Sequence, residues 1–516
     1  MKQVVVQIKI KPGEVNSPGA IRNEALKTAG LPDDKNISTR VLRRSIDARS
    51  RKPHFVMQVA IGDPESVEQK SSVFTPQPLN GKQIVIAGAG PAGYFAALTL
   101  LEHGIKPIII ERGRTVNDRR KDLKKIYTED LINPDSNYCF GEGGAGTYSD
   151  GKLYTRATKR GNVGRILDLL IANGAPGDIR IDAHPHLGSN VLPRIVSKMR
   201  EDILACGGEI HFNTRVDSFI LDGDRMTGVI AAGNTIKADA VILATGHSAR
   251  DIFHALADQD IKIEAKPFAL GVRIEHPQPL IDKIFYHQSP RHENLPAASY
   301  RISTQAMGRG VFSFCMCPGG YIVPASTSPG ELVLNGMSLA ARNAPFANAG
   351  LVAEVKLEDL ENQENPLCAL EYQANAEKRM FAAGDGITQQ APAQRVTDFI
   401  AARTSKSIPK TSYIPGVYSA PVHELLPFIQ SEALRNGLKA LGKKFKGFDS
   451  EEAKVLAVES RTSSPVRIPR DRETLEHVQI KGFFPCGEGA GYAGGIISAA
   501  MDGEKCALAA AAKINE

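Results

Sequence analysis

Apolar and polar residues alternate over residues 2–10, which predicts a strand, and apolar residues recur with helical spacing over residues 18–30. Two further alternating stretches, ISTRVLRRSIDAR and PHFVMQVAI, predict two more strands. The stretch SSVFTPQPLNGK at residues 71–82 is polar, twice interrupted by proline and typical of a linker. We therefore expect residues 1–80 to form a small α+β domain.

Beyond the linker, apolar residues gather in short continuous runs that are followed by glycines or by a helical stretch. These runs occur in IVIAGAG, KPIIIERG, ADAVILATG and the C-terminal FFPCGEG. A long segment with further strand-like patterns separates ADAVILATG from FFPCGEG. The pattern predicts an α/β fold class, with a discontinuous Rossmann-like domain of residues 81–265 and 476–516 and an inserted, mixed α+β substrate domain at residues 266–475.

The length and composition of the chain indicate its size class and its cellular compartment. A chain of 516 residues exceeds what one core usually organises and has room to bury a large cofactor. No run approaches the roughly 20 apolar residues of a membrane span, and lysines interrupt MKQVVVQIKIKPGE where a signal peptide needs an apolar core. The seven cysteines lack framework spacing, which suggests reduced thiols. We expect a cytoplasmic protein with no membrane partner.

The net charge of +6 is concentrated near the N-terminus. Residues 1–75 contain 13 Lys and Arg against 8 Asp and Glu, a difference of 13 − 8 = +5. A basic domain of this kind can bind an acidic partner or nucleic acid. The favoured interpretation is a solvated basic face, because no aromatic residues are interleaved with the charges.

The strongest motif directly follows the apolar run at residues 84–87, where Gly88, Gly90 and Gly93 stand in GxGxxG spacing. In dinucleotide-binding domains these glycines permit the tight turn, the approach of a pyrophosphate and the close packing of helix on sheet. Pro91 suits the first helical turn, so the helix N-terminus should face the phosphates. The alternative is a glycine-rich turn without a ligand.

The next apolar run ends in Glu111, 23 residues after Gly88. An acidic side chain at this place can bind an adenosine ribose, and it disfavours the 2′-phosphate of NADP. FAD and NAD remain as the expected nucleotides.

Two later glycine turns favour FAD. ADAVILATG ends in Ala244, Thr245 and Gly246, and the C-terminal turn leads into a helix of small residues. Both resemble recurring pieces of two-domain FAD flavoproteins, in which the last turn brings an acid to the ribityl chain. Most members have Asp there, whereas Glu488 follows Gly487 in this chain. No second GxGxxG follows a buried strand, so NAD(P)H would bind transiently near the flavin, or electrons arrive from elsewhere.

The chain as a whole resembles a family of bacterial proteins called FAD-dependent, or NAD(FAD)-utilising, dehydrogenases, whose physiological reaction is not generally established. The resemblance runs from SIDAR at residues 45–49 almost to the C-terminus. The motifs on which the resemblance rests are GAGPAG, GEGGAGTYSDGKLYTR, HPHLGSN, FCMCPGG, NGMSLAAR, ESRTSSPVRIPRD and PCGEGAGYAGGIISAAMDG. It implies a bound FAD and names no substrate.

The resemblance also implies which residues hold the cofactor. Gly88, Gly90, Pro91, Ala92 and Gly93 would bind the pyrophosphate, and Glu111 would bind the ribose. Gly143, Gly144, Ser149 and Lys152 would contact the diphosphate or the flavin edge, and Gly487, Glu488, Gly495 and Ile496 the ribityl chain and ring. Arg112 is a further cofactor-binding candidate, and Ala244, Thr245 and Gly246 would lie beside the nucleotide. The alternative for GEGGAGTYSDGKL is a surface loop, but four glycines in six residues favour close ligand approach.

ESRTSSPVRIPRD carries three arginines among hydroxyl side chains. Arg461 is our candidate for binding a substrate carboxylate or phosphate, and a solvated loop is an equally weighted alternative. HPH at residues 184–186 has no further ligands at metal spacing, so structural histidines are expected and no metal site is predicted. For His247 the alternatives are contact with the flavin or substrate and a loop hydrogen bond, and the loop hydrogen bond is favoured.

The cysteines of VFSFCMC give the last candidate site. In a regular strand Phe312, Phe314 and Met316 would pack inward, and Cys315 and Cys317 would share the other face with Ser313. Their α-carbons would be roughly 6.6 Å apart, so a disulfide would be strained, and zinc would need a second cysteine pair. Catalytic thiols facing the flavin and inert buried thiols both remain, with inert packing slightly favoured.

Taken together, the motifs predict an FAD-dependent oxidoreductase that transfers a hydride between flavin and a small organic substrate, which would be anionic if Arg461 binds it. One alternative is an FAD-dependent protein that modifies nucleic acid such as tRNA, guided by the basic N-terminal domain. Another is a flavin-binding sensor or assembly protein without turnover.

Overall fold

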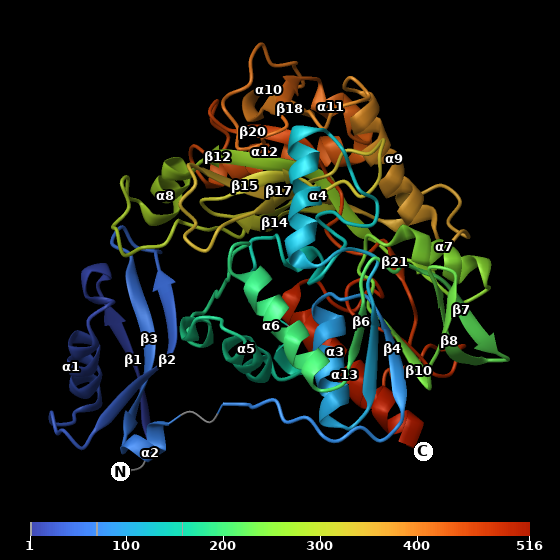
Figure 1. Cartoon of the computed structure of the whole chain (residues 1–516). Coiled ribbons are helices and arrows are strands. Elements are labelled where there is room, and N and C mark those ends of the chain that lie inside the picture. Colours follow the sequence, from blue (N-terminus) through green and yellow to red (C-terminus); the bar gives the residue numbers. More distant parts are fainter. Residues whose placement is uncertain (1–2, 69–70, 157, 516) are drawn as a thin grey trace.

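The computed structural model describes residues 3–68, 71–156 and 158–515. Within these ranges the larger sheets have three, five and seven strands. Figure 1 shows the N-terminal three-stranded unit at the left, the five-stranded sheet with its helices at the lower right, and the seven-stranded sheet above it.

The N-terminal unit has the strands and the helix that the alternating pattern predicts. They are β1 (Val4–Ile10), α1 (Pro18–Ala29), β2 (Ser38–Asp47) and β3 (His54–Gly62), followed by the short α2 (Pro64–Val67). β3 lies between β1 and β2 and runs antiparallel to both. The side chain of Ser17 caps α1, and Gly30 ends it with φ +67°.

The five-stranded sheet is parallel and is built from distant parts of the chain. Its order is β22-β10-β4-β5-β6. The strands are β4 (Gln83–Ala87), β5 (Lys106–Ile110), β6 (Glu209–His211), β10 (Ala240–Leu243) and β22 (Phe483–Pro485). Because β22 returns beside β10, the Rossmann-like part is discontinuous, and the predicted α/β fold class is confirmed.

Both faces of this sheet are covered, as a buried parallel sheet requires. Ile84 and Ile86 pack into a cluster with the helices of one face, and Val85 and Ala87 pack into a cluster with α7 and the sheet β7-β8-β9. The covering elements are α3 (Pro91–Glu102), α5 (Val163–Ala172), α6 (Leu192–Ala205), α13 (Ile496–Asn515), α7 (Arg250–Asp258), β7 (Val216–Asp222), β8 (Arg225–Ala231) and β9 (Asn234–Lys237).

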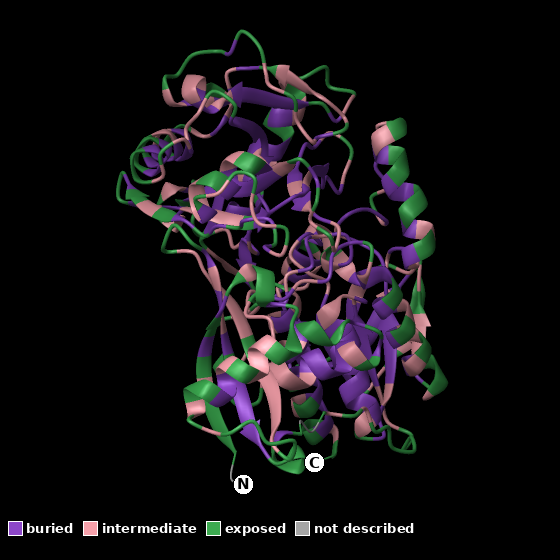
Figure 2. Cartoon of the chain, turned by 90° about the vertical axis from the view of Figure 1, so that its left-hand side faces the viewer, coloured by how far each residue is buried: buried purple, intermediate pink, exposed green. Residues whose placement is uncertain are grey.

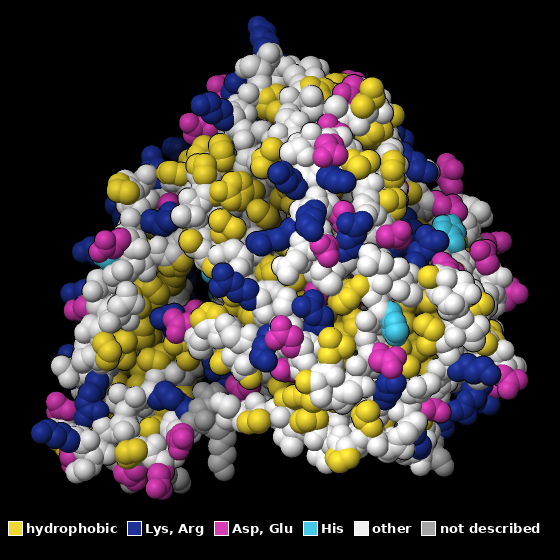
Figure 3. All heavy atoms as spheres, viewed as in Figure 1, with side chains coloured by type: hydrophobic (Ala, Val, Ile, Leu, Met, Phe, Trp, Pro, Cys, Tyr) yellow, Lys and Arg dark blue, Asp and Glu magenta, His cyan; other side chains and the backbone are white. Residues whose placement is uncertain are grey.

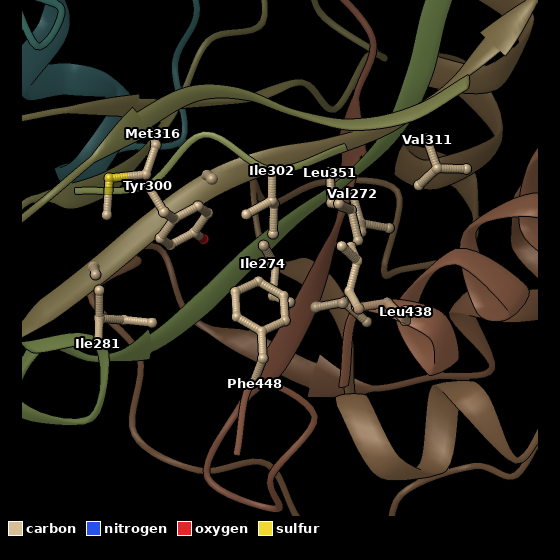
Figure 4. Packing of buried hydrophobic residues seen from close by; sticks show 14 of the residues in the cluster. Val272, Ile274, Ile281, Tyr300, Ile302, Val311, Met316, Leu351, Leu438 and Phe448 are labelled. Atoms are coloured by element: carbon tan, nitrogen blue, oxygen red, sulfur yellow. The ribbon is translucent and has the colours of Figure 1, made fainter. Parts of the chain in front are cut away.

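The seven-stranded sheet is mainly antiparallel and has the order β13-β14-β17-β12-β20-β18-β19. Its apolar side chains pack with Leu438 of α12 and with Phe448, as Figure 4 shows. The elements are β12 (Phe268–Pro277), β13 (Ser303–Ala306), β14 (Arg309–Cys317), β17 (Phe346–Val355), β18 (Ala391–Arg395), β19 (Val417–Ser419), β20 (Lys454–Glu459) and α12 (Phe428–Lys444).

Further helices and short strands lie outside these sheets. They are α4 (Val116–Thr128), β11 (Glu264–Ala265), α8 (Gln278–Tyr286), β15 (Tyr321–Pro324), β16 (Leu334–Met337), α9 (Cys368–Ala382), α10 (Val396–Ile400), α11 (Val422–Leu425) and β21 (Val466–Arg467). Figure 2 shows buried residues concentrated in the sheets and exposed residues on outer helix faces and loops. Across the described ranges, no helix has the length and apolarity needed to cross a membrane.

Candidate functional site

The turn between β4 and α3 has the close contacts that its glycines permit. A Cβ on Gly88, which has φ +107°, would lie 2.5 Å from the carbonyl oxygen of Ala244. A Cβ on Gly93 would lie 2.0 Å from the oxygen of Gly88, so only glycine lets the helix sit this close. The first residues of α3, Pro91 and Ala92, line a cavity at the carboxyl end of the sheet.

A second helix begins at the same cavity. α13 starts at Ile496 directly after Gly495, and both residues line the cavity wall. The two helices pack closely, because a Cβ on Gly503 of α13 would lie 2.1 Å from the oxygen of Ala92. Two helix N-termini therefore meet one cavity, where their unpaired amides and dipoles favour an anionic group such as a diphosphate.

The cavity collects most of the residues predicted from the sequence. It is lined by Gly88, Gly90, Pro91, Ala92, Glu111, Arg112, Gly144, Ser149, Lys152, Ala244, Thr245, Gly246, Glu488, Gly495 and Ile496, together with Cys315, Cys317 and Arg461. Gly93, Gly143 and Gly487 are not among the lining residues. A Cβ on Gly143 would lie 2.0 Å from the hydroxyl oxygen of Thr147. The individual contacts of these residues with a cofactor stay predictions.

Glu111 is buried at the end of the cavity next to β5, where backbone amides bind its carboxylate. Oε2 accepts a hydrogen bond of 2.9 Å from Ala89, and Oε1 accepts bonds of 2.8 and 2.9 Å from Gly113 and Gly141. The carboxylate thus joins the GxGxxG turn to the glycine-rich loop. Oε2 still has acceptor capacity for a ligand hydroxyl.

Arg112, beside Glu111, is held in place by acids. It donates to Asp135 at 2.8 Å and to Asp251 at 2.9 Å, and its guanidinium lies 4.2 Å from the ring centre of Phe140. These contacts fix the cavity wall at this end.

Two further features fit a bound FAD. The hydroxyl of Ser248 lines the cavity, is buried and has no hydrogen-bond partner in the described part of the chain. At Gly246 and Gly495 a Cβ would meet open space. A free buried hydroxyl and glycine walls suit a ligand whose hydroxyls and phosphates approach the backbone. Ser248 was not predicted, although it follows the Ala-Thr-Gly turn by two residues.

At the other end of the cavity, β14 departs from the expected alternation. Cys315 has φ +40°, and the pairing of β14 with β17 shifts register between Phe314 and Cys317. Met316 is buried in the core shown in Figure 4, but Phe312 and Phe314 are only half-buried. The expected inward packing of both phenylalanines is therefore wrong, because the bulge interrupts the period of two.

The two cysteines consequently have different surroundings. Cys315 is exposed, and Cys317 is fully buried, with its sulfur 3.5 Å from Nη2 of Arg273. Both line the cavity. The exposed surface of Cys315 opens into this confined space, where burial raises its pKa to about 12 although the positive charge of Lys152 opposes the shift. Burial also raises the pKa of Cys317. Both groups are therefore neutral thiols at physiological pH.

Lys152 supplies positive charge beside these thiols. Its ammonium lies 3.1 Å from the carboxylate of Asp150, which also pairs with Arg342 and Ser338. Burial disfavours the charged lysine, but the negative charge of Asp150 opposes this effect, and the pKa of Lys152 is raised. The side chain keeps its proton in the physiological range.

Arg461 lines the cavity, but its donors are engaged within the protein. It lies 3.0 Å from Glu377 and 3.2 Å from Glu331, and it donates to Thr327 at 2.8 Å. Arg250, at the start of α7, pairs with the same two acids at 2.7 Å each. Burial opposes ionisation of Glu377, but the arginines outweigh it and lower its pKa to about 2. The sequence left two alternatives for Arg461, an anion-binding guanidinium and a solvated loop. In the structure the side chain is buried and its donors are bound to other residues of the protein.

Three side chains that could bind a metal ion lie close together outside the cavity. Among the described residues, the side chains of Cys486, Asp502 and Cys506 have ligand atoms within 4.8 Å of one another. Arg470 already donates to Asp502 at 2.6 Å and to the sulfur of Cys506 at 3.2 Å. The guanidinium of Arg470 neutralises the Asp502 carboxylate and would repel a metal cation. These side chains therefore form a buried polar contact between Arg470 and α13.

Glu488 and His247 complete the lining near the C-terminal turn. Burial raises the pKa of Glu488 to about 7, and Lys266 opposes the shift. Burial lowers the pKa of His247 to about 4, with Arg461 acting in the same direction. The His247 Nε2 lies 3.2 Å from the carbonyl oxygen of Arg461 and makes the loop hydrogen bond that was expected. Tyr154 and Asn335 also line the cavity and were missed, although both lie in quoted motifs.

Three family models match successive parts of the chain. Residues 82–263 match pyridine nucleotide-disulphide oxidoreductases, and residues 267–462 match the C-terminal domain-like part of FAD-dependent proteins. Residues 1–62 match a domain of unknown function. The first two models agree with the cavity described above.

Individual proteins are also similar to this chain. An uncharacterized protein of Clostridium beijerinckii is 43% identical over 427 residues, covering 82% of this chain and 79% of that protein. A thiamine thiazole synthase of Aeropyrum pernix is 25% identical over 182 residues, covering 32% of this chain and 55% of the synthase. Among solved structures, the match to CtdE in complex with FAD covers 84% of this chain and 84% of that chain, at 14% identity and TM-score 0.33. The match to E. coli quinol fumarate reductase FrdA covers 85% of this chain and 71% of that chain, at 13% identity and TM-score 0.37. Structural similarity of this extent is too low to assign a reaction.

Proposed function

Because the chain belongs to a family of FAD-dependent oxidoreductases whose reaction is not established, we propose that it transfers a hydride between FAD and a small organic substrate held beside Lys152 and Cys315. FAD, when bound, supplies the capacity to accept or donate the hydride. The observation that carries the proposal is that one cavity joins the GxGxxG turn to Lys152 and Cys315.

The residues at the first end of the cavity would hold the cofactor. Backbone amides at Gly90 and Ala92 and at the start of α13 would bind the diphosphate, since both helix N-termini meet there. Glu111 and Ser248 would bind hydroxyl groups, because each has an oxygen with free hydrogen-bonding capacity.

Lys152 would act on the substrate at the second end. Its protonated ammonium can stabilise negative charge that develops on a substrate oxygen, or return a proton to it. Asp150 fixes the lysine from one side, and Arg342 and Ser338 hold that carboxylate in turn. The orientation of Lys152 is therefore set by the protein before a substrate binds.

Cys315 would donate a hydrogen bond in the same place. The positive φ turns its side chain out of the regular strand, and Arg273 binds the Cys315 carbonyl oxygen at 2.8 Å. Such a backbone conformation is unfavourable for a residue with a side chain and is kept only where surrounding contacts hold it. A thiol with pKa about 12 is a poor nucleophile, so the donor role is favoured over a thiolate redox pair.

NAD(P)H is proposed as a transient hydride donor. The test is anaerobic stopped-flow reduction of the holoprotein by NADH and by NADPH, each with and without deuterium at the transferred position. A primary isotope effect on flavin bleaching is expected with one of them. Bleaching without an isotope effect, or no bleaching by either donor, would contradict direct transfer from a nicotinamide.

The substrate end is tested by reoxidation of the reduced protein with a panel of quinones and unsaturated carboxylic acids. Lys152→Met should slow reoxidation by a productive acceptor at least tenfold with FAD content unchanged. Lys505→Met, which removes an exposed charge on α13, is the matched control. Equal rates in all three proteins would remove Lys152 from the reaction.

A further inference from the structure

A second cavity adjoins the first one at Phe314, whose side chain lines both. The neighbouring residues of β14 divide between the two cavities, since Cys315 lines the first and Phe312 lines the second. The segment after β20 divides in the same way, because Arg461 lines the first cavity and residues 462–463 line the second. Two separate segments of the chain thus pass from one cavity to the other.

The position of Phe312 and Phe314 in the seven-stranded sheet explains this arrangement. Val311 and Leu351 point into the core that the sheet shares with α12 (Figure 4). Side chains alternate between the two faces of a strand, and the pairing of β14 with β17 is regular from Val311 to Phe314. Phe312 and Phe314 therefore project from the face turned away from this core, and they are half-buried because they line cavities.

The wall of the second cavity is predominantly apolar. The cavity begins at the two phenylalanines of β14 and reaches the ends of β12 and β17, where Phe268 pairs with Val355. Its volume is about 390 Å³, which is enough for a small organic group. Three phenylalanine rings in one wall favour an aromatic or aliphatic group that leaves water when it binds.

The charged side chains of the second cavity already have partners. Glu354 accepts a hydrogen bond of 2.8 Å from the amide of Gly310, and Lys356 lies 3.3 Å from the carboxylate of Glu358. One acid and one base also give the described lining no net charge. Figure 3 shows acidic and basic side chains interspersed over the face in view, and not a field of one sign that would gather anions. The second cavity therefore suits an uncharged group.

The adjoining part of the first cavity suits a polar, reacting group. Lys152 and Cys315 line it and can both donate hydrogen bonds, because the lysine is protonated and the thiol is neutral. The donors of Arg461 are bound to Glu331 and Glu377. The remaining donors match a carbonyl oxygen, on which negative charge develops when a conjugated carbonyl compound accepts a hydride.

We propose that the substrate is an uncharged conjugated carbonyl compound, such as a quinone, whose carbonyl end reaches Lys152 in the first cavity and whose apolar substituent occupies the second cavity. Phe314 lies where the two parts of the substrate meet, and Phe312 lines the space that the substituent fills. Both are specificity-determining residues. The inference rests on the proposed function and adds the class of substrate to it.

The reaction balances with a quinone as the acceptor. The quinone takes a hydride, with its two electrons, from the reduced cofactor, so one bond to hydrogen breaks in the cofactor and one forms in the acceptor. Lys152 gives a proton to the other carbonyl oxygen and regains one from water. The products are a hydroquinone and the oxidised cofactor, which the nicotinamide donor proposed above reduces again.

The test compares two quinones that differ in one substituent, tetramethyl-1,4-benzoquinone and trimethyl-pentyl-1,4-benzoquinone. Full substitution of the ring prevents addition of thiols. Binding to the oxidised holoprotein is measured by isothermal titration calorimetry, and reoxidation of the reduced holoprotein is followed by stopped flow. We expect the unmodified protein to bind the pentyl quinone at least tenfold more tightly than the tetramethyl quinone, and to be reoxidised by it with an at least tenfold higher second-order rate constant.

The variants separate the second cavity from the rest of the protein. Phe312→Ala removes a ring that, of the two cavities, lines only the second, and it should reduce the preference for the pentyl quinone to less than threefold. Phe312→Leu should retain most of the preference, because it keeps an apolar side chain there. Phe314→Ala should weaken binding of both quinones. Phe428→Ala is the matched control and should retain the full preference, since Phe428 is 76% exposed at the start of α12.

Equal binding of the two quinones by the unmodified protein would overturn the proposal, as would a preference that Phe312→Ala and Phe428→Ala retain alike. Tighter binding of fumarate than of either quinone would overturn it in favour of an anionic substrate. Binding to the oxidised protein needs no electron transfer, so failure of the proposed function is seen separately. If quinone binding depends on Phe312 but no quinone reoxidises the reduced protein, hydride transfer is contradicted while the binding site stands.

Discussion

The guanidinium of Arg461 lies 3.0 Å from the carboxylate of Glu377, and both side chains are buried at the cavity wall. Arg250 reaches the same carboxylate from the start of α7 at 2.7 Å. Arg461 thus holds together two parts of the protein that line the cavity, and its effect on a substrate is indirect.

This ion pair predicts that Arg461→Met mainly affects stability. Removing one partner from a buried ion pair leaves a carboxylate undercompensated, which typically costs about 3–5 kcal/mol. Urea unfolding followed by circular dichroism should show a loss of that order. Arg467→Met, at an exposed position of the same motif, should change stability little. An Arg461→Met protein with unchanged stability and a raised KM for an anionic acceptor would instead support the sequence-based role.

The GxGxxG turn predicts a steric effect of a single methyl group. Gly93→Ala would place a Cβ 2.0 Å from the Gly88 oxygen, so α3 must move away from β4 and the purified protein should contain little FAD. Gly19→Ala is the matched control in α1, where a Cβ would meet nothing within 4 Å. Flavin absorbance per chain measures both, and full FAD content in Gly93→Ala would show that the turn does not carry the cofactor.

The surroundings of Cys315 predict slow alkylation in spite of its exposure. With a pKa of about 12, the thiolate fraction rises about tenfold for each pH unit, so the rate with iodoacetamide should climb from pH 8 to pH 10 without a plateau. Mass spectrometry of the peptide containing residue 315, with Cys315→Ser as the blank, gives the rate. A plateau below pH 9 would indicate a thiolate and would reopen the nucleophilic role.

Glu488 predicts a pH dependence of stability. Its pKa is about 7 in the folded protein and near 4.5 when unfolded, so the folded state binds more protons between these values. The stabilisation is therefore fully present below pH 4.5 and is lost as pH rises to about 7. The loss amounts to about 1–3 kcal/mol.

Glu488→Gln is the control for this effect. It should be more stable than the unmodified protein above pH 7, and the part of the pH profile between 4.5 and 7 that belongs to Glu488 should disappear. Parallel stability profiles in the two proteins would show that Glu488 titrates normally.

The parts of the fold that depend on local pattern could be predicted from the sequence. The alternation near the N-terminus gave β1, β2 and β3, and the short apolar runs followed by glycines gave β4, β10 and β22 of one parallel sheet. The cavity follows from the same rule, because helices that start after parallel strands meet at one edge of the sheet.

The parts that depend on tertiary contacts could not be predicted. A bulge at Cys315 arises from the pairing of β14 with β17, and no residue type in VFSFCMC marks it. The partners of Arg461 come from Glu331 and Glu377, 130 and 84 residues away, so the motif around Arg461 looked free to bind a ligand.

The central claim is that this cavity binds FAD and carries out hydride transfer at its Lys152 and Cys315 end. The most direct measurement is the absorbance spectrum of the purified holoprotein before and after anaerobic addition of NADH or NADPH, with the released cofactor identified by chromatography. The account predicts one FAD per chain, bleached by one of the two donors, and little FAD in Gly93→Ala. A colourless protein that takes up no FAD on reconstitution, or a bound flavin that neither donor reduces, would contradict it.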